Sequence, residues 1–164
     1  MMRGLWKKLE SILRLPSATN GKPHALNPAE ILKADYYDLR RLAEQIRTHA
    51  ERAPYPHMAE RLRQIALEKQ KSAIVLKEKS LGLGCELEEH SPIIKSGKNH
   101  WQRMAQDLED HKALENSFLE QVVRLAEEAP EISALLREVV AAQRPHKEAL
   151  LDLVARADPQ ADQS

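Results

Sequence analysis

The stretches that decide the fold are LKADYYDLRRLAEQIRTHAERAP, residues 32–54, and LEDHKALENSFLEQVVRLAEEAP, residues 108–130. An offset of 76 positions aligns them, and both end in Ala-Pro. Apolar residues recur every three or four positions in each stretch, which predicts an amphipathic α-helix. A second apolar pattern follows each one, and an offset of 74 positions matches Leu62 to Leu136 and Leu76 to Leu150. The sequence therefore predicts two related helical hairpins.

Two amphipathic hairpins cannot each bury an apolar stripe alone, so we expect an all-α, antiparallel four-helix bundle. The expected helices span about 28–52, 56–81, 99–128 and 130–157. Asn27 and Pro28 form a helix-start signal, and Gly82 and Gly84 predict where the second helix ends. Residues 83–97 lie between the hairpins, and fifteen extended residues reach about 50 Å, enough to traverse a bundle about 40 Å long.

The sequence divides into an N-terminal unit of residues 1–27, the bundle of residues 28–157 and a tail of residues 158–164, which is expected to be disordered. Residues 3–14 have the pattern of a short amphipathic helix with basic residues on its polar side. Such a helix is expected to dock on its own bundle, on a neighbouring subunit, or on another protein or a membrane surface.

Composition argues against several classes of function. The 25 basic residues equal the 25 acidic residues, so no overall field favours nucleic acid. The lone Cys85 rules out a disulfide framework and fits a reducing compartment. No apolar run approaches the roughly 20 residues of a membrane span, and the first residues do not have the pattern of a secretory signal. We expect a cytoplasmic protein.

Polar residues interrupt the apolar stripes of all four expected helices. They place seven polar side chains in the core: Asp35, Lys69, Ser72, His111, Glu115, Gln143 and His146. Glu68 and Lys71 fall on the polar side of the second helix and are expected to be solvated. Because buried charges must be paired, the seven residues predict a connected polar network. Pro145 predicts a kink near this level.

The repeated hairpins resemble the ferritin-like superfamily, of the rubrerythrin and bacterioferritin kind. The resemblance covers about residues 28–157, and IALEKQKSA at residues 65–73 is similar to the second-helix signature of that family. It implies a bundle in which each hairpin supplies one Glu and one Glu-x-x-His to a site for two metal ions, and a homodimer or larger assembly. This chain departs from that pattern at the metal-binding positions, which hold Asp35, Lys69-x-x-Ser72, His111 and Gln143-x-x-His146.

Two hypotheses follow for the core. In the favoured one, Lys69 pairs with Asp35 and Glu115, no metal binds, and the protein is non-catalytic and acts by self-association or by binding a partner. In the alternative, His111, Glu115 and His146, with Asp35 as a fourth ligand, hold a single zinc or non-haem iron ion in a metal-binding protein or an oxidoreductase. The sequence leaves open whether the protein is an enzyme. His57, His90 and His100, which lie at expected helix starts or in the connection, are expected to be exposed.

Overall fold

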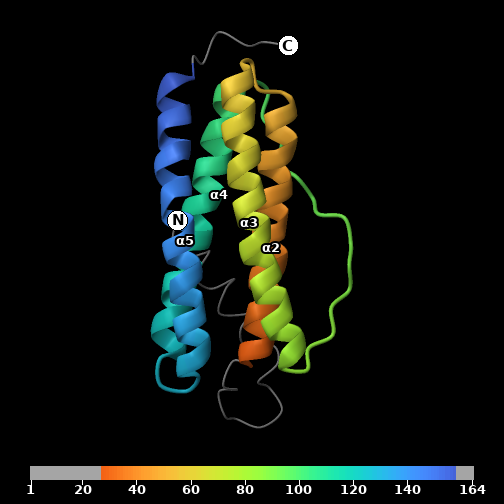
Figure 1. Ribbon diagram of the computed structural model, residues 1–164, viewed down its shortest axis with the longest axis vertical. Coiled ribbons are helices and arrows are strands. Elements are labelled where there is room, and N and C mark those ends of the chain that lie inside the picture. The colour runs from red at the N-terminus through yellow and green to blue at the C-terminus, as the bar shows by residue number, and fades with distance from the viewer. Residues whose placement is uncertain (1–26, 158–164) are drawn as a thin grey trace, which may run out of the picture.

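The computed structural model describes residues 27–157, and this part of the chain contains four α-helices and no strand (Figure 1). The helices are α2 (Pro28–Glu51), α3 (Pro56–Gly82), α4 (His100–Leu125) and α5 (Pro130–Arg156). Each lies where the sequence predicts a helix. The expected helix at residues 3–14, its linker and the tail lie outside the described residues, so those expectations stay predictions.

Local sequence signals account for the helix boundaries. The Asn27 side chain accepts a hydrogen bond from the Ala29 amide at 3.0 Å, as the predicted cap requires. After α3, Gly84 adopts a φ of 95°, a left-handed conformation that glycine allows without strain. One boundary differs, because α4 ends at Leu125 and not near residue 128. The hydroxyl of Ser133 in α5 donates to the Val122 carbonyl of α4 at 2.6 Å, across the turn that joins the two helices of the second hairpin.

The four helices pack as a bundle. The helices of each hairpin lie along one another, and the hairpins meet through contacts of α2 with α4 and of α3 with α5. Residues 83–99 form the crossover, which runs along the outside of the bundle in Figure 1. The crossover runs alongside α2 and in the same direction. The Tyr37 hydroxyl donates to the Glu88 carbonyl at 2.8 Å, and further along both segments the Lys95 amide donates to Gln45 Oε1 at 3.0 Å.

The core consists of two apolar clusters with a polar level between them. The first cluster gathers Leu32, Tyr36, Leu39, Ala73, Leu76, Phe118, Val122, Leu125, Ile132, Leu136, Val139 and Val140. The second gathers Leu42, Ile46, Ala50, Met58, Leu62, Ile65, Ala66, Met104, Leu108, Leu150 and Leu153. Lys69, His111 and Gln143 are buried and lie between the two clusters along α3, α4 and α5. Polar interruptions on α3, α4 and α5 therefore form one layer inside the bundle.

Pro145 lies within α5, which continues as a helix to Arg156. Proline has no backbone N–H, so the Ala141 carbonyl has no helical hydrogen bond from residue 145. Pro145 and Ala141 are both exposed, so water can donate to that carbonyl instead. Of the helices in residues 27–157, none combines the length and the apolar character that crossing a membrane requires.

Candidate functional site

The centre of the polar layer is the side chain of Lys69, which is 1% exposed. Its Nζ atom lies 2.6 Å from Oε1 of Gln143 and 2.9 Å from Nδ1 of His111. α3, α4 and α5 each supply one of these three side chains. The ammonium thus donates to one acceptor on each of the two helices of the second hairpin.

The remaining hydrogen bonds extend this layer to the bundle surface. Gln143 Nε2 donates to the Ser72 hydroxyl at 3.1 Å, which assigns Oε1 to the Lys69 side. His146 Nε2 lies 2.6 Å from a carboxylate oxygen of Glu68, whose side chain is 43% exposed. Glu68 was expected to be solvated only, and the structure instead gives it a buried partner. We call the connected set Lys69, Ser72, His111, Gln143, His146 and Glu68 the lysine network.

The network constrains the ring hydrogens of its two histidines. Because Lys69 donates to Nδ1 of His111, the ring hydrogen lies on Nε2. Burial, and then the nearby Lys69, lowers the pKa of His111 to about 3, so this ring is neutral at neutral pH. Burial and Lys69 also lower the pKa of His146 against the opposing effect of Glu68. The 2.6 Å contact with the Glu68 carboxylate requires a hydrogen on Nε2 of His146, whose Nδ1 lies 3.2 Å from Oε1 of Gln143.

Burial also perturbs Lys69 itself. Removal from water lowers its pKa to about 7, although the negative charges of Asp107, Glu115 and Glu68 act in the opposite direction. An uncharged amine still donates hydrogen bonds, so the layer can stay connected in both protonation states of Lys69.

A small cavity adjoins Lys69 and His111. Its volume is about 10 Å³, which is close to the space of a single water molecule. It is lined by Lys69, His111, Leu114, Glu115, Phe118, Val140 and Gln143. Nε2 of His111 has no hydrogen-bond partner among the described residues and lies 3.6 Å from a carboxylate oxygen of Glu115. This cavity is too small to receive an organic substrate, so such a substrate cannot reach Lys69 or His111 through it.

Glu115 belongs to the edge of this layer. Its carboxylate is 14% exposed and accepts a hydrogen bond from Lys147 at 3.1 Å. The prediction that Glu115 pairs directly with Lys69 is wrong, because Lys69 bonds to neutral acceptors and Glu115 acts on it only through its charge.

Asp35 lies outside the lysine network, and its predicted pairing with Lys69 is also wrong. One carboxylate oxygen accepts from Gln121 Nε2 at 2.9 Å, and the other has no hydrogen-bond partner in residues 27–157. Burial raises the pKa of Asp35 to about 7. The contacts of α2 with α4 explain the separation, since Gln45 and not Asp35 lies beside Asp110, next to His111. Ten residues of helix separate Asp35 from Gln45, about 15 Å along the axis.

A second buried polar cluster, which the sequence reasoning missed, joins α2, α4 and the crossover. Gln45 Nε2 donates to Asp107 at 2.8 Å and to Asp110 at 3.0 Å, and His49 Nδ1 lies 2.7 Å from Asp107. The other ring nitrogen of His49 lies 3.2 Å from the Lys95 carbonyl. We call Gln45, His49, Asp107, Asp110 and Lys95 the crossover clasp. The paired spacings of 45 with 49 and of 107 with 110 were its only sequence signal.

The structure also corrects the surface assignment of one histidine. His57 and His90 are exposed as predicted, but His100 is buried at the start of α4. His100 is the first residue of α4, where helical periodicity alone does not specify burial.

No three or more His, Cys, Asp or Glu side chains within residues 27–157 are grouped so that they could hold a metal ion. Of the four ligands in the single-metal hypothesis, Asp35 bonds to Gln121, and both ring nitrogens of His146 already face protein partners. Lys69 further places a donor against His111. No protein-family model, curated protein or solved structure matches the chain.

Proposed function

We propose that this protein is a ferritin-like four-helix bundle without an intact di-iron site, that it is non-catalytic, and that it acts in the cytoplasm by associating with itself or with a partner protein. The internal repeat and the long crossover support the ferritin-like arrangement. So do the contacts between hairpins, because Asp35 meets Gln121 while Gln45 meets Asp107, as in helices that run in opposite directions.

The observation that carries the proposal is the position of Lys69. Lys69 stands at the position of the Glu in the Glu-x-x-His motif of the ferritin-like superfamily. Its Nζ atom lies within hydrogen-bond distance of His111 and Gln143. A cationic or amine donor at that point takes up the acceptors that would otherwise face a metal ion. Repulsion between an ammonium and a divalent cation within a few ångströms would strongly oppose metal binding in a buried site.

The size of the interior space supports a non-catalytic role. The cavity beside Lys69 is about 10 Å³, which accommodates water but no organic substrate. Lys69 and His111, whose pKa values are strongly lowered, are therefore shut off from substrates, and the outer surfaces of the helices remain as the places where a partner can bind.

The proposal is tested by metal analysis of untagged, full-length protein after anaerobic incubation with iron and zinc, followed by desalting. We expect well under one equivalent of either metal. In the Lys69→Glu/Ser72→His variant, which restores one Glu-x-x-His motif, we expect increased uptake if the lysine is what excludes the metal. One equivalent in the unaltered protein, lost in His146→Ala, would overturn the proposal and favour the single-metal alternative.

A further inference from the structure

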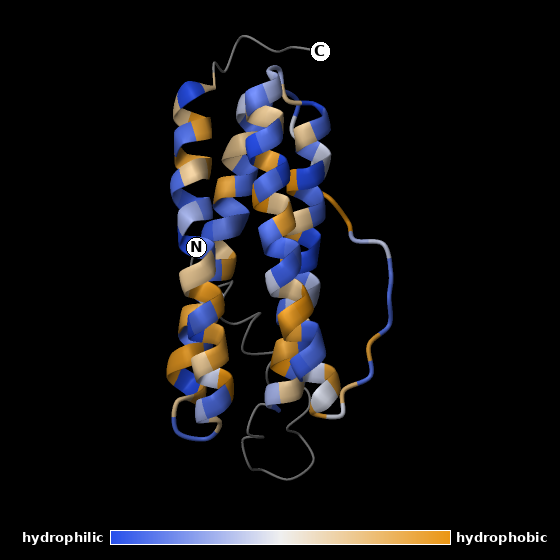
Figure 2. Cartoon of the chain, in the orientation of Figure 1, coloured by the Kyte–Doolittle hydropathy of each residue, from blue (hydrophilic) through white to orange (hydrophobic). Residues whose placement is uncertain are grey.

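The outer face of α3 carries an apolar stripe. Leu67, Ile74 and Leu81 recur every seven residues, and these residues are 51%, 42% and 45% exposed. The opposite face of the same helix is buried and contains Leu62 and Leu76. Figure 2 shows apolar segments alternating with hydrophilic ones along α3. α3 thus has two apolar faces, of which the bundle core uses one.

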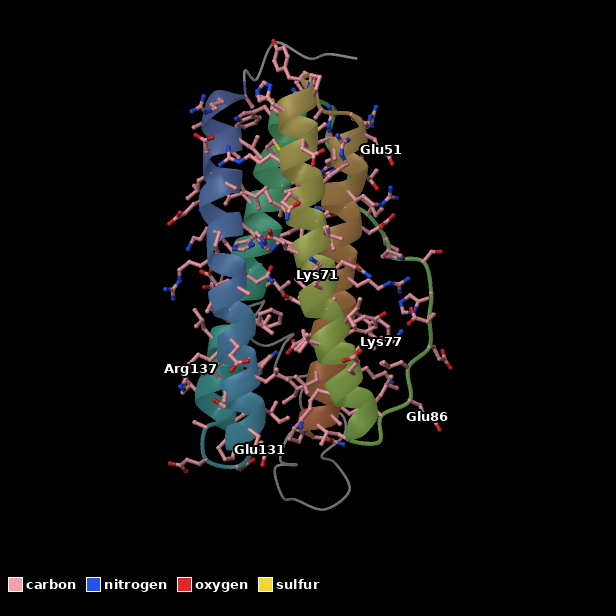
Figure 3. The ribbon with its side chains drawn as sticks, viewed as in Figure 1. Glu51, Lys71, Lys77, Glu86, Glu131 and Arg137 are labelled. Atoms are coloured by element: carbon pink, nitrogen blue, oxygen red, sulfur yellow. The ribbon has the colours of Figure 1, made fainter. Side chains whose placement is uncertain are left out.

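Two charged residues lie within the same stripe. Lys71 and Glu78 are both exposed, and Lys71 also acts through its charge on the neighbouring Glu68. Figure 3 shows Lys71 in the middle of α3, on the side facing the viewer. At about 100° per residue, the five positions 67, 71, 74, 78 and 81 fall within an arc of about 80°. Opposite charges therefore flank the central Ile74 on one outward line.

We propose that this stripe is the interface through which a second copy of the chain binds, with two α3 helices packed antiparallel about a two-fold axis near Ile74. The proposal specifies the surface of the self-association put forward above, and rests on it. In this arrangement Ile74 faces Ile74, Leu67 faces Leu81, and Lys71 faces Glu78 of the other copy. Two-fold symmetry forms each unlike contact twice.

The charges select the antiparallel direction. A parallel pairing of the same stripes in register would place Lys71 against Lys71 and Glu78 against Glu78, which is repulsive in both layers. In the antiparallel pairing, Lys71 of each copy instead meets Glu78 of the other, so both contacts join opposite charges. The apolar spacing fits both directions equally, so the charges supply the specificity.

A groove beside the stripe adds to the contact area. It has a volume of about 630 Å³ and lies between α2, α3 and the crossover, where Leu67 and Gln70 line one wall and Pro92 lines another. In the antiparallel pairing the end of α3 from the second copy, with Leu81 and the exposed Leu83, lies next to this groove. A single helix pair buries less than the roughly 800 Å² per partner of a standard interface, so we expect a weak, concentration-dependent dimer.

The test is sedimentation analysis of the full-length protein from about 1 µM to about 1 mM, the range in which a small interface becomes half-assembled. We expect the unaltered protein to form a dimer. Lys71→Glu and Glu78→Lys should each weaken the dimer at least tenfold, because each reversal places two like-charge contacts in the interface. The double variant Lys71→Glu/Glu78→Lys should recover most of the lost affinity. Lys112→Glu, an exposed position on α4, is the matched control and should have no effect.

Three results would overturn the interface: a protein that stays monomeric throughout the range, an oligomer that is insensitive to the Lys71 reversal, or a double variant no better than the two single variants. Helical content measured by circular dichroism confirms that each variant is folded. These failures are distinct from failure of the proposed function, since metal uptake would overturn the latter whatever the oligomeric state.

Discussion

Lys69 donates a hydrogen bond of 2.6 Å to Gln143, which is its own counterpart in the second hairpin. The same offset of 74 positions relates Ser72 to His146, and Gln143 bonds to Ser72 as well. The two halves of the chain therefore meet at equivalent positions, as expected where a repeat packs on its own copy. Within the lysine network the two halves of the repeat differ in charge, because Lys69 in the first hairpin corresponds to the neutral Gln143 in the second.

Replacement of Lys69 by Met should destabilise the fold by about 1–3 kcal/mol at pH 9.5, because it leaves the acceptors on His111 and Gln143 without a donor. The cost should be smaller at pH 7. The folded pKa of Lys69 is about 7, below its ordinary value of 10.5, so the unfolded state holds the extra proton between these values. The contribution of Lys69 to stability therefore increases as the pH rises through this window.

Urea unfolding of the unaltered protein and of Lys69→Met at both pH values measures this difference. Lys112→Met, at an exposed position on α4, controls for loss of a surface charge. An identical cost at the two pH values would show that Lys69 does not change its protonation differently in the folded and unfolded states.

His111 should be a neutral ring with its hydrogen on Nε2 from about pH 5 to pH 8. Its pKa is lowered to about 3, and Lys69 donates to Nδ1. Nitrogen-detected NMR of the imidazole distinguishes the two tautomers directly. In Lys69→Met the Nδ1 atom loses its donor, and we expect the tautomer populations to change. A ring in the Nδ1–H form in the unaltered protein would contradict the hydrogen bond from Lys69.

Replacement of Asp35 by Asn should stabilise the protein by about 1–3 kcal/mol near pH 8 and have little effect near pH 4. The folded pKa of Asp35 is about 7, above its ordinary 3.8, so ionisation costs the folded state stability as the pH rises between these values. Asn keeps an acceptor for Gln121 and removes the charge. Thermal unfolding across this range is the measurement, with Glu109→Gln, at an exposed position on α4, as the control. A destabilised Asp35→Asn protein at pH 8 would mean that the charge has a partner.

Gln45 should hold the crossover on the bundle. Its side chain accepts from the Lys95 amide and donates to Asp107 and Asp110, so Gln45→Ala breaks the crossover clasp at its centre. We expect faster hydrogen exchange at the Lys95 amide and a stability loss of about 1–3 kcal/mol, because buried carboxylates lose their donor. Gln106→Ala, which removes a single bond to Asp110, is the control. Unchanged exchange at Lys95 would show that other contacts hold the crossover.

The sequence by itself determined the helices and their approximate ends. Helical periodicity, the Asn27 cap and the glycines after α3 are local, so each acts within a few residues whatever the rest of the chain does. The same periodicity placed Lys69, His111, Gln143 and His146 on inward faces, and all four are buried.

Only the tertiary structure decided which of these polar residues meet. Periodicity gives the face of a helix but not its axial offset against another helix, and that offset arises from the packing of whole hairpins. For this reason Asp35 bonds to Gln121, about three turns from the level at which it was expected. Glu68 and Asp107 lie beside the apolar stripes rather than within them, so their burial or bonding depends on neighbours that the linear pattern does not specify.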